Sequence, residues 1–393
     1  MPDSISSQVS KYIDQLQLLG SAIALITAMC GIVLFVMWYK TGIPKVLVGK
    51  QRAVRVPWDW LEVFLAALLL LFIMDALIIT LPWGKHKLQT EDYAGYQISV
   101  AASAMQVAAD QGLSGGLLTL PGALVSYKPE LTRQLEDARS RIINTVLFFP
   151  LLLVVFFNVM KRLCGARLYQ MGLHLNRWKE NFTLGTLVWL VITPICNVLL
   201  LILLLHFWET LWGRNTEHPM GMLLMQDSRY STWILVGILT CVIAPLKEEL
   251  LLRGVVQPYL VRNPVASDVL VILSIIWAFS NLMTPGTGPD RGMGLGPLLF
   301  VFFAAPGYYL FEIWVKPWIS EPGAARGIFA TSLFFAALHA GAWPQPVPLF
   351  LFSLAVGILA YRTRSLIGPI TVHILFNLTT MISMLLHEYP NWK

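Results

Sequence analysis

The sequence predicts an all-α polytopic integral membrane protein, and three observations lead to this prediction. The 393 residues are 56% hydrophobic and only 13% charged, which leaves too little polar surface for a water-soluble globule of this length. The apolar residues gather in runs long enough to cross a bilayer as helices. The basic residues fall in short segments beside these runs, where they act as topology signals.

Ten apolar runs are candidate membrane-spanning helices, and several of the later ones are short or contain Gly and Pro. They cover roughly residues 18–39, 58–83, 142–160, 183–206, 232–260, 266–283, 297–314, 327–342, 347–361 and 366–386.

Charge in the connecting segments predicts the orientation. Segments 40–57 and 161–182 each carry five basic residues and at most one acid, which places both on the cytoplasmic side. Alternation through ten spans then puts both termini outside the cytoplasm. The strength of the bias favours a bacterial inner membrane as the location.

The chain is expected to divide into three parts. Residues 1–160 form an N-terminal membrane region that includes a small extramembrane helical cap at 84–141, and residues 161–229 form a linker and an accessory transmembrane helix. Residues 230–387 form the third part.

The net charge of +6 lies in the topology-determining loops, so the expected partner is the lipid bilayer and not nucleic acid. The four cysteines are scattered, which predicts neither a disulfide framework nor a thiolate metal site.

Four ionisable residues lie in one apolar run, in the stretch "APLKEELLLRG" at 244–254. Charged groups at bilayer depth cost several kcal/mol unless they are paired or face a water-filled cavity, so they are functional candidates. Glu249 and Arg253 are four residues apart on one helical face and are expected to form an ion pair. Glu248 lies on an adjacent face without a partner in its own helix. A carboxylate in such a low-dielectric setting suits a general base.

Two other apolar runs contribute polar side chains. His339 lies in "TSLFFAALHAG", and His373 and Asn377 lie in "PITVHILFNLTTM", four residues apart and therefore on one face. Counting ~1.5 Å of rise per residue from the inner helix ends places Glu248 and His339 ~18 Å deep, Asn377 ~16 Å, and His373 and Arg253 ~10 Å. Three helices thus deliver polar groups to a similar level.

The chemistry that fits these residues is activation of water for peptide hydrolysis inside a membrane. Glu248 would take a proton from water, His339 would help to hold that water, and His373 with Asn377 would donate to an oxyanion. A structural alternative is that the same residues only join helices by hydrogen bonds. A second alternative is a proton-coupled transporter, with Asp75 as a further buried acid, although the chain lacks the internal repeats of many carriers.

Signatures of other intramembrane proteases are incomplete in this sequence. The closest approach to HExxH is "HEYPN" from His387, which lacks the second histidine. The GxSG pattern at 112–115 falls in the polar cap, where such a sequence favours a turn. No GxGD is present, because "GTGPD" contains an additional proline.

"EELLLRG" (248–254), "FAALH" (335–339) and "HILFN" (373–377) resemble, in order, the EExxxR, FxxxH and HxxxN motifs of the CPBP (Abi) intramembrane proteases. That family includes the type II CAAX prenyl endopeptidase. The resemblance covers about 230–387, which it marks as a CPBP-like protease core. It implies hydrolysis of membrane-associated peptides or prenylated, CAAX-type proteins. A catalytically inactive relative acting as a scaffold or immunity factor would carry the same motifs.

The resemblance also implies roles for single residues. Glu248 would be the catalytic base, Glu249 and Arg253 would organise the site, His339 would bind the attacking water, and His373 with Asn377 would stabilise the tetrahedral intermediate. Glu248, His339 and His373 would also be the ligands if the enzyme held zinc. No carboxylate partner for either histidine is apparent in the sequence, which favours a mechanism that requires no cofactor.

The chain departs from the family in the spacing of its first two motifs. An additional hairpin at about 266–325 separates them, and its first helix, "SIIWAFSNLM", resembles the second motif with Asn281 in place of histidine. Either Asn281 or His339 could therefore face Glu248. We expect His339, because the sequence after it continues as in the family.

Overall fold

The computed structural model describes residues 56–73, 121–203, 224, 229–283, 295–315, 319, 323–340 and 345–388. All regular structure in these ranges is helical, and none of it is strand, which confirms the predicted all-α class. The first part of the chain contributes α3 (Trp60–Ala67), the π-helical η1 (Leu68–Ile73), α6 (Pro121–Cys164), the short η3 (Leu168–Met171) and α7 (Trp178–Leu203).

The C-terminal part begins with one continuous helix that changes its winding four times. Its segments are α10 (Tyr230–Ile238), η5 (Leu239–Ile243), α11 (Ala244–Glu249), η6 (Leu250–Val256) and α12 (Gln257–Arg262), of which η5 and η6 are π-helical. The remaining helices are α13 (Pro264–Met283), α14 (Leu295–Val315), α15 (Ala324–Leu338), α16 (Pro346–Thr363) and α17 (Ile367–Glu388).

Four helices of the described part are long and apolar enough to cross a membrane. They are 138–164 of α6, 178–200 of α7, the whole of α16, and 367–385 of α17. Shorter apolar helices lie at 60–71, 264–278 and 324–338. The chain is therefore an integral membrane protein, whereas the count of ten spans is not confirmed. The expected first span, 18–39, lies outside the described residues.

The border between the expected cap and the third span falls inside a single helix. Residues 121–141 of the cap, predicted as an extramembrane piece, form the first half of α6, which continues into the apolar second half without a break. The stretch "ELTRQLEDARSR" at 130–141 is rich in residues with high helix propensity, so nothing local ends the helix there. The part of the cap at 84–120 lies outside the described residues.

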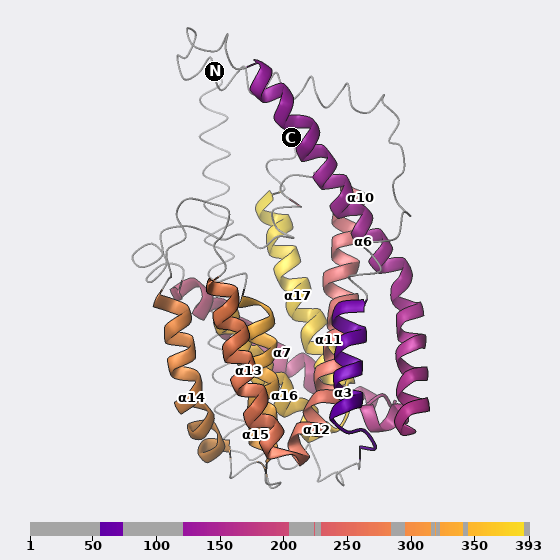
Figure 1. Cartoon of the computed structure of the whole chain (residues 1–393), viewed down its shortest axis with the longest axis vertical. Coiled ribbons are helices and arrows are strands. Elements are labelled where there is room, and N and C mark those ends of the chain that lie inside the picture. The colour runs from indigo at the N-terminus through magenta and orange to yellow at the C-terminus, as the bar shows by residue number, and fades with distance from the viewer. Residues whose placement is uncertain are drawn as a thin grey trace.

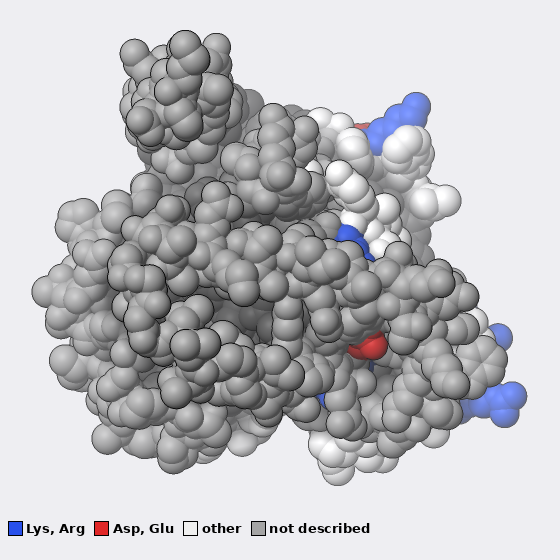
Figure 2. Space-filling view, turned by 90° about the horizontal axis from the view of Figure 1, so that it is seen from above, with Lys and Arg blue, Asp and Glu red and all other residues white. Residues whose placement is uncertain are grey.

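The helices run up and down in alternation (Figure 1), so that several connections meet at one end of the bundle. There Leu366 donates its backbone N–H to the carbonyl of Gly172, and His174 Nε2 lies 3.0 Å from the carbonyl oxygen of Arg364. Arg262 reaches the carbonyl of Val56 at the same end. These connections belong to the basic segments expected on the inner side. Seen from above (Figure 2), few charged side chains of the described part are visible.

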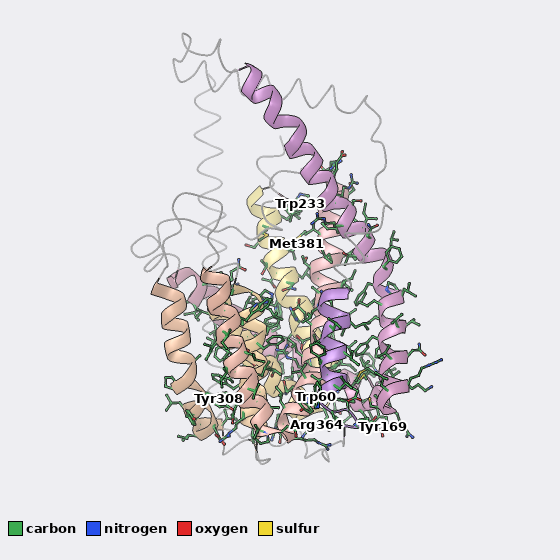
Figure 3. All side chains as sticks on the ribbon, in the orientation of Figure 1. Trp60, Tyr169, Trp233, Tyr308, Arg364 and Met381 are labelled. Carbon is green, nitrogen blue, oxygen red and sulfur yellow. The ribbon has the colours of Figure 1, made fainter. Side chains whose placement is uncertain are left out.

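The core of the bundle is centred on α15. Nearly every residue of this helix is buried, including Ile328, Leu333 and Phe335, because α12, α13 and α16 pack around it. A second cluster near the upper end joins Ile142 and Trp233 and receives Met381 of α17 (Figure 3). The inner face of α6 joins the main core through Phe149, Phe156 and Met160. Its outer face exposes leucines and valines, as a lipid-facing helix does.

The helices of the insert are joined to the core by a cluster of polar side chains. Tyr308 of α14 donates a hydrogen bond of 2.5 Å to Asp268 of α13. Arg326 at the start of α15 lies 3.5 Å from Asp268 and donates to Glu312 at 3.1 Å. This cluster ties three helices together at one end of the bundle.

Close packing of α7 on α17 depends on Gly185. A Cβ at this position would lie 2.7 Å from the carbonyl oxygen of Gly368 and 2.9 Å from Cβ of Thr371. Gly185→Ala is therefore expected to lower the free energy of unfolding by about 1–3 kcal/mol. The control is Gly237→Ala in α10, where the nearest atom to a new Cβ is Met381 Cε at 3.8 Å. We expect that variant to be neutral or stabilising in thermal unfolding; equal effects of both variants would contradict the prediction.

Candidate active site

The two adjacent glutamates lie on α11, a single α-helical stretch between two π-helical ones. Single π-helical turns inside α-helices are frequent at functional sites. Only Glu248 reaches an accessible space, with 20% of its side chain exposed against 0% for Glu249. The two carboxylates therefore have different surroundings although they are neighbours in the chain.

Glu249 is held from two sides. One carboxylate oxygen lies 2.8 Å from Nδ1 of His373, and the other lies 3.3 Å from Nε of Arg253. Arg253 in turn donates from Nη2 to the Ser353 hydroxyl at 2.6 Å, and its guanidinium lies 5.4 Å from the ring centre of Phe335. The structure thus brings together the ion pair that the spacing predicts, and Glu249 is fixed in position by its partners.

His373 lies between the two glutamates. Because a carboxylate accepts hydrogen bonds, the contact with Glu249 assigns a proton to Nδ1 of His373. The other ring nitrogen, Nε2, faces Glu248 at 3.8 Å. Glu248 therefore has its neighbour in α17, which its own helix could not provide. The expectation that no carboxylate supports a histidine here is wrong, since Glu249 supports His373.

His339 directly follows α15 as its C-cap residue, and it is half-buried. Its Nδ1 lies 2.8 Å from the carbonyl oxygen of Phe335, so Nδ1 is the donor and Nε2 is left to accept in the neutral ring. The Phe335 ring packs against both histidines, with centroid distances of 4.7 Å to His339 and 5.8 Å to His373. Both imidazoles therefore belong to one cluster around Phe335.

Asn377 faces the same continuous helix as His373, as their spacing of four residues predicts. Its amide nitrogen donates a hydrogen bond of 2.7 Å to the carbonyl of Thr240 in η5. That contact uses one of its two amide hydrogens and leaves the second for another acceptor. Asn377 therefore also ties α17 to the π-helical turn that precedes α11.

Asn281, the other candidate to face Glu248, lies on α13, and its side chain is outside the described part of the structure. Ala278, one turn earlier, packs against Ala337 and Ala340 of the segment that carries His339. Among the described side chains, His373 is the ionisable neighbour of Glu248, at 3.8 Å.

Glu248, His339 and His373 are the ligands expected if the enzyme depends on a metal. Within the described ranges, no three His, Cys, Asp or Glu side chains are gathered closely enough to hold a metal ion. A catalytic zinc takes three protein ligands and a water molecule in a tetrahedron.

Several residues of the site were missed by the sequence analysis. Arg253 donates to Ser353, and Asn377 donates to the carbonyl of Thr240. Gln257, one turn after Arg253, donates to the carbonyl of Gly357. Phe335 supplies the ring against which both histidines pack. Polar residues inside apolar runs, such as Ser353 in "LFLFSLAVG", were the available signal. Serine is common in membrane helices, however, so its contact with Arg253 could not be distinguished without the fold.

Comparison with known proteins finds one related family. The family model of the Rce1-like type II CAAX prenyl endopeptidases matches residues 230–316 and 308–379. The C-terminal region is related to the CAAX protease family. No curated protein and no solved structure matches the chain.

The matched region, residues 230–379, contains all six predicted site residues, from Glu248 to Asn377. It extends from α10 into α17 and so includes the densest part of the core. The relationship indicates a protease at the level of the family. The residues before 230 lie outside the match, which leaves the N-terminal membrane region without a counterpart in that family model.

Ser353, in the matched region, allows a test of how firmly Arg253 is held. Its hydroxyl is fully buried and accepts a 2.6 Å hydrogen bond from the guanidinium. We expect Ser353→Ala to lower the free energy of unfolding by about 1.5–3 kcal/mol, because the partner is charged. The control, Ser332→Ala, is equally buried but loses only a bond to the carbonyl of Ile328 in its own helix. A loss no larger than that of the control in thermal unfolding would contradict the prediction.

Proposed function

We propose that this chain is an intramembrane endopeptidase that hydrolyses peptide bonds of membrane-associated, CAAX-type substrates with water activated by Glu248. One observation carries the proposal. Glu248, partly exposed, faces Nε2 of His373 at 3.8 Å, while His373 is held from behind by the fully buried Glu249. A base beside an imidazole with a fixed tautomer is the arrangement that general-base hydrolysis needs.

The distance between Glu248 and His373 suits one shared water. Two acceptor atoms 3.8 Å apart can both lie within about 2.8 Å of a single oxygen, the usual length of a hydrogen bond to water. The water would donate one hydrogen to the Glu248 carboxylate and the other to Nε2 of His373. Its lone pairs would then point away from both side chains, towards a substrate carbonyl.

The reaction follows from this placement. Glu248 takes a proton from the water as the oxygen adds to the scissile carbonyl carbon, which forms a tetrahedral intermediate. The proton then passes from Glu248 to the leaving amine nitrogen as the carbon–nitrogen bond breaks. The second hydrogen of the water stays on the acyl product, which leaves as a carboxylic acid and passes this proton to the released amine. The products are therefore a carboxylate and an ammonium, and Glu248 returns to its ionised form.

Other side chains stabilise the charge that develops. The remaining amide hydrogen of Asn377 is the donor available to the oxyanion, because Nε2 of His373 accepts from the water in this scheme. Arg253 and Glu249 do not react in this scheme. They keep His373 in one orientation, and such preorganised dipoles lower the barrier without rearrangement during the reaction.

The test is cleavage of a panel of peptides, prenylated and plain, by the purified full-length chain in lipid, followed by mass spectrometry. We expect cleavage of the membrane-associated members and a preference for the prenylated ones. Cleavage of none of them would overturn the proposal. Equal cleavage of both kinds would retain the protease and remove the preference for prenylated substrates.

Metal removal gives a separate prediction. Because Glu248 and His373 can activate water without an ion, treatment with a zinc chelator is expected to leave the cleavage rate unchanged. The rate is measured before and after chelation and again after zinc is restored. A loss of activity that zinc reverses would show that the enzyme is metal-dependent and that this mechanism is wrong.

The transporter and the inactive scaffold are not favoured by the family relationship. A transporter would move protons or solute in proteoliposomes without cleaving peptides. An inactive relative would do neither. The peptide panel therefore separates the three functions.

A further inference from the structure

A small cavity lies beside the buried ion pair, at the end of the bundle where the basic connections meet. Its volume is about 40 Å³. Tyr169 and Arg364, which mark this end of the molecule in Figure 3, belong to its wall. The wall also includes Met171, Arg253, Gln257 and Ser365.

Two polar side chains in the wall are buried and incompletely bonded. Gln257 is 3% exposed; its amide nitrogen donates to the carbonyl of Gly357 at 2.9 Å, but no described residue donates to its Oε1. Arg253 is 4% exposed, and although Nη2 is bonded to Ser353, no described residue accepts from Nη1. Each such buried group costs about 1–3 kcal/mol if it stays unpaired.

The two missing hydrogen bonds, one to an acceptor and one from a donor, indicate which ligand would fit the cavity. Gln257 Oε1 needs a donor and Arg253 Nη1 needs an acceptor. An anion would satisfy Arg253 and be repelled by the oxygen of Gln257, while a cation would be repelled by Arg253. An apolar group would satisfy neither. Water both donates and accepts, and because one water needs about 10–15 Å³ of such volume, the cavity of about 40 Å³ holds about two to four.

We propose that water fills this cavity, bridges Gln257 to Arg253, and connects the buried ion pair with solvent at the end of the bundle that carries the basic connections. Tyr169 in the wall is 47% exposed, so the cavity extends from the surface to a guanidinium that is otherwise buried. This water is separate from the one that Glu248 would activate, because it contacts Arg253 on the side of Gln257. It hydrates the arginine that orders Glu249 and His373.

Two methionines allow a direct test in the full-length protein in lipid nanodiscs. Met171 lines the cavity and Met160 does not, although they are almost equally buried, at 2% and 1% exposure. Brief X-ray irradiation makes hydroxyl radicals from bound water, and these oxidise neighbouring methionines. We expect Met171 to be oxidised several-fold faster than Met160, as measured by mass spectrometry. Equal rates would overturn the proposal.

A variant that fills the cavity provides the second measurement. Ala360 lines it, and Ala360→Leu is expected to bring the oxidation of Met171 down to the rate of Met160. The control is Ala355→Leu in the same helix, outside the wall of the cavity, which is expected to leave the ratio unchanged. Unchanged oxidation of Met171 in Ala360→Leu would overturn the proposal. If that variant does not fold, the wild-type comparison decides. No substrate is used, so the result does not depend on the proposed proteolysis.

Discussion

Replacing Glu248 by Gln is expected to lower the rate of peptide cleavage by about 10²–10⁴-fold, the usual contribution of a general base. The substitution removes the ability to take a proton and keeps the size of the side chain. Because Glu248 is 20% exposed and lies as far as 3.8 Å from His373, we expect the fold to depend little on its charge. The measurement is the initial rate on the best peptide of the panel, together with the temperature of unfolding.

The matched control is Glu180→Gln. Glu180 forms an exposed ion pair with Arg177 at the surface, and such pairs contribute little to stability. We expect it to cleave at the wild-type rate. If Glu248→Gln cleaves as fast as this control, Glu248 is not the base. If Glu248→Gln and Glu180→Gln are both folded and both inactive, the loss of activity is not specific to Glu248.

Arg253→Met is expected to be the most destabilising of these substitutions. It would leave Glu249, which is 0% exposed, with a buried negative charge and without its cationic partner. Breaking a buried pair from one side costs about 3–5 kcal/mol, because the remaining charge is uncompensated. The hydrogen bond to Ser353 and the contact with Phe335 are lost as well. Unfolding in mixed micelles of increasing denaturing detergent measures the loss.

The double variant Glu249→Gln with Arg253→Met distinguishes the cause. Its neutral amide can still accept from His373, so it is expected to be more stable than Arg253→Met alone. Arg262→Met, on an exposed arginine of the same continuous helix, is the control and is expected to change the free energy of unfolding by less than about 0.5 kcal/mol. A double variant no more stable than the single one would show that lost packing, and not the uncompensated charge, causes the effect.

The two predictions distinguish a catalytic role for Glu248 from a structural role for Glu249. Glu248 and Glu249 are chemically identical and adjacent in the chain, yet one is accessible and the other is enclosed by Arg253 and His373. Glu248→Gln is expected to lose activity without losing stability. Arg253→Met, which removes the partner of Glu249, is expected to lose stability.

The sequence by itself determined the class of the protein. Apolar runs and the near absence of charge require helices in a membrane, because only helices satisfy their own backbone hydrogen bonds there. The spacing of Glu249 and Arg253, and of His373 and Asn377, predicted which residues share a face, since helical periodicity is local. The order of the three motifs indicated a resemblance to the CAAX proteases, and the family comparison supports that relationship over residues 230–379.

Only the tertiary structure decided how the three helices meet. That His373 inserts between two glutamates 124 and 125 residues away, with Glu249 as its carboxylate partner, depends on the packing of α17 against α11. The π-helical turns on either side of α11, the role of Ser353 and the cavity beside Gln257 likewise arise from contacts between distant segments. Local patterns specify which face a residue occupies, but the depth and rotation of each helix are set by its neighbours, and these fix the distances on which chemistry depends.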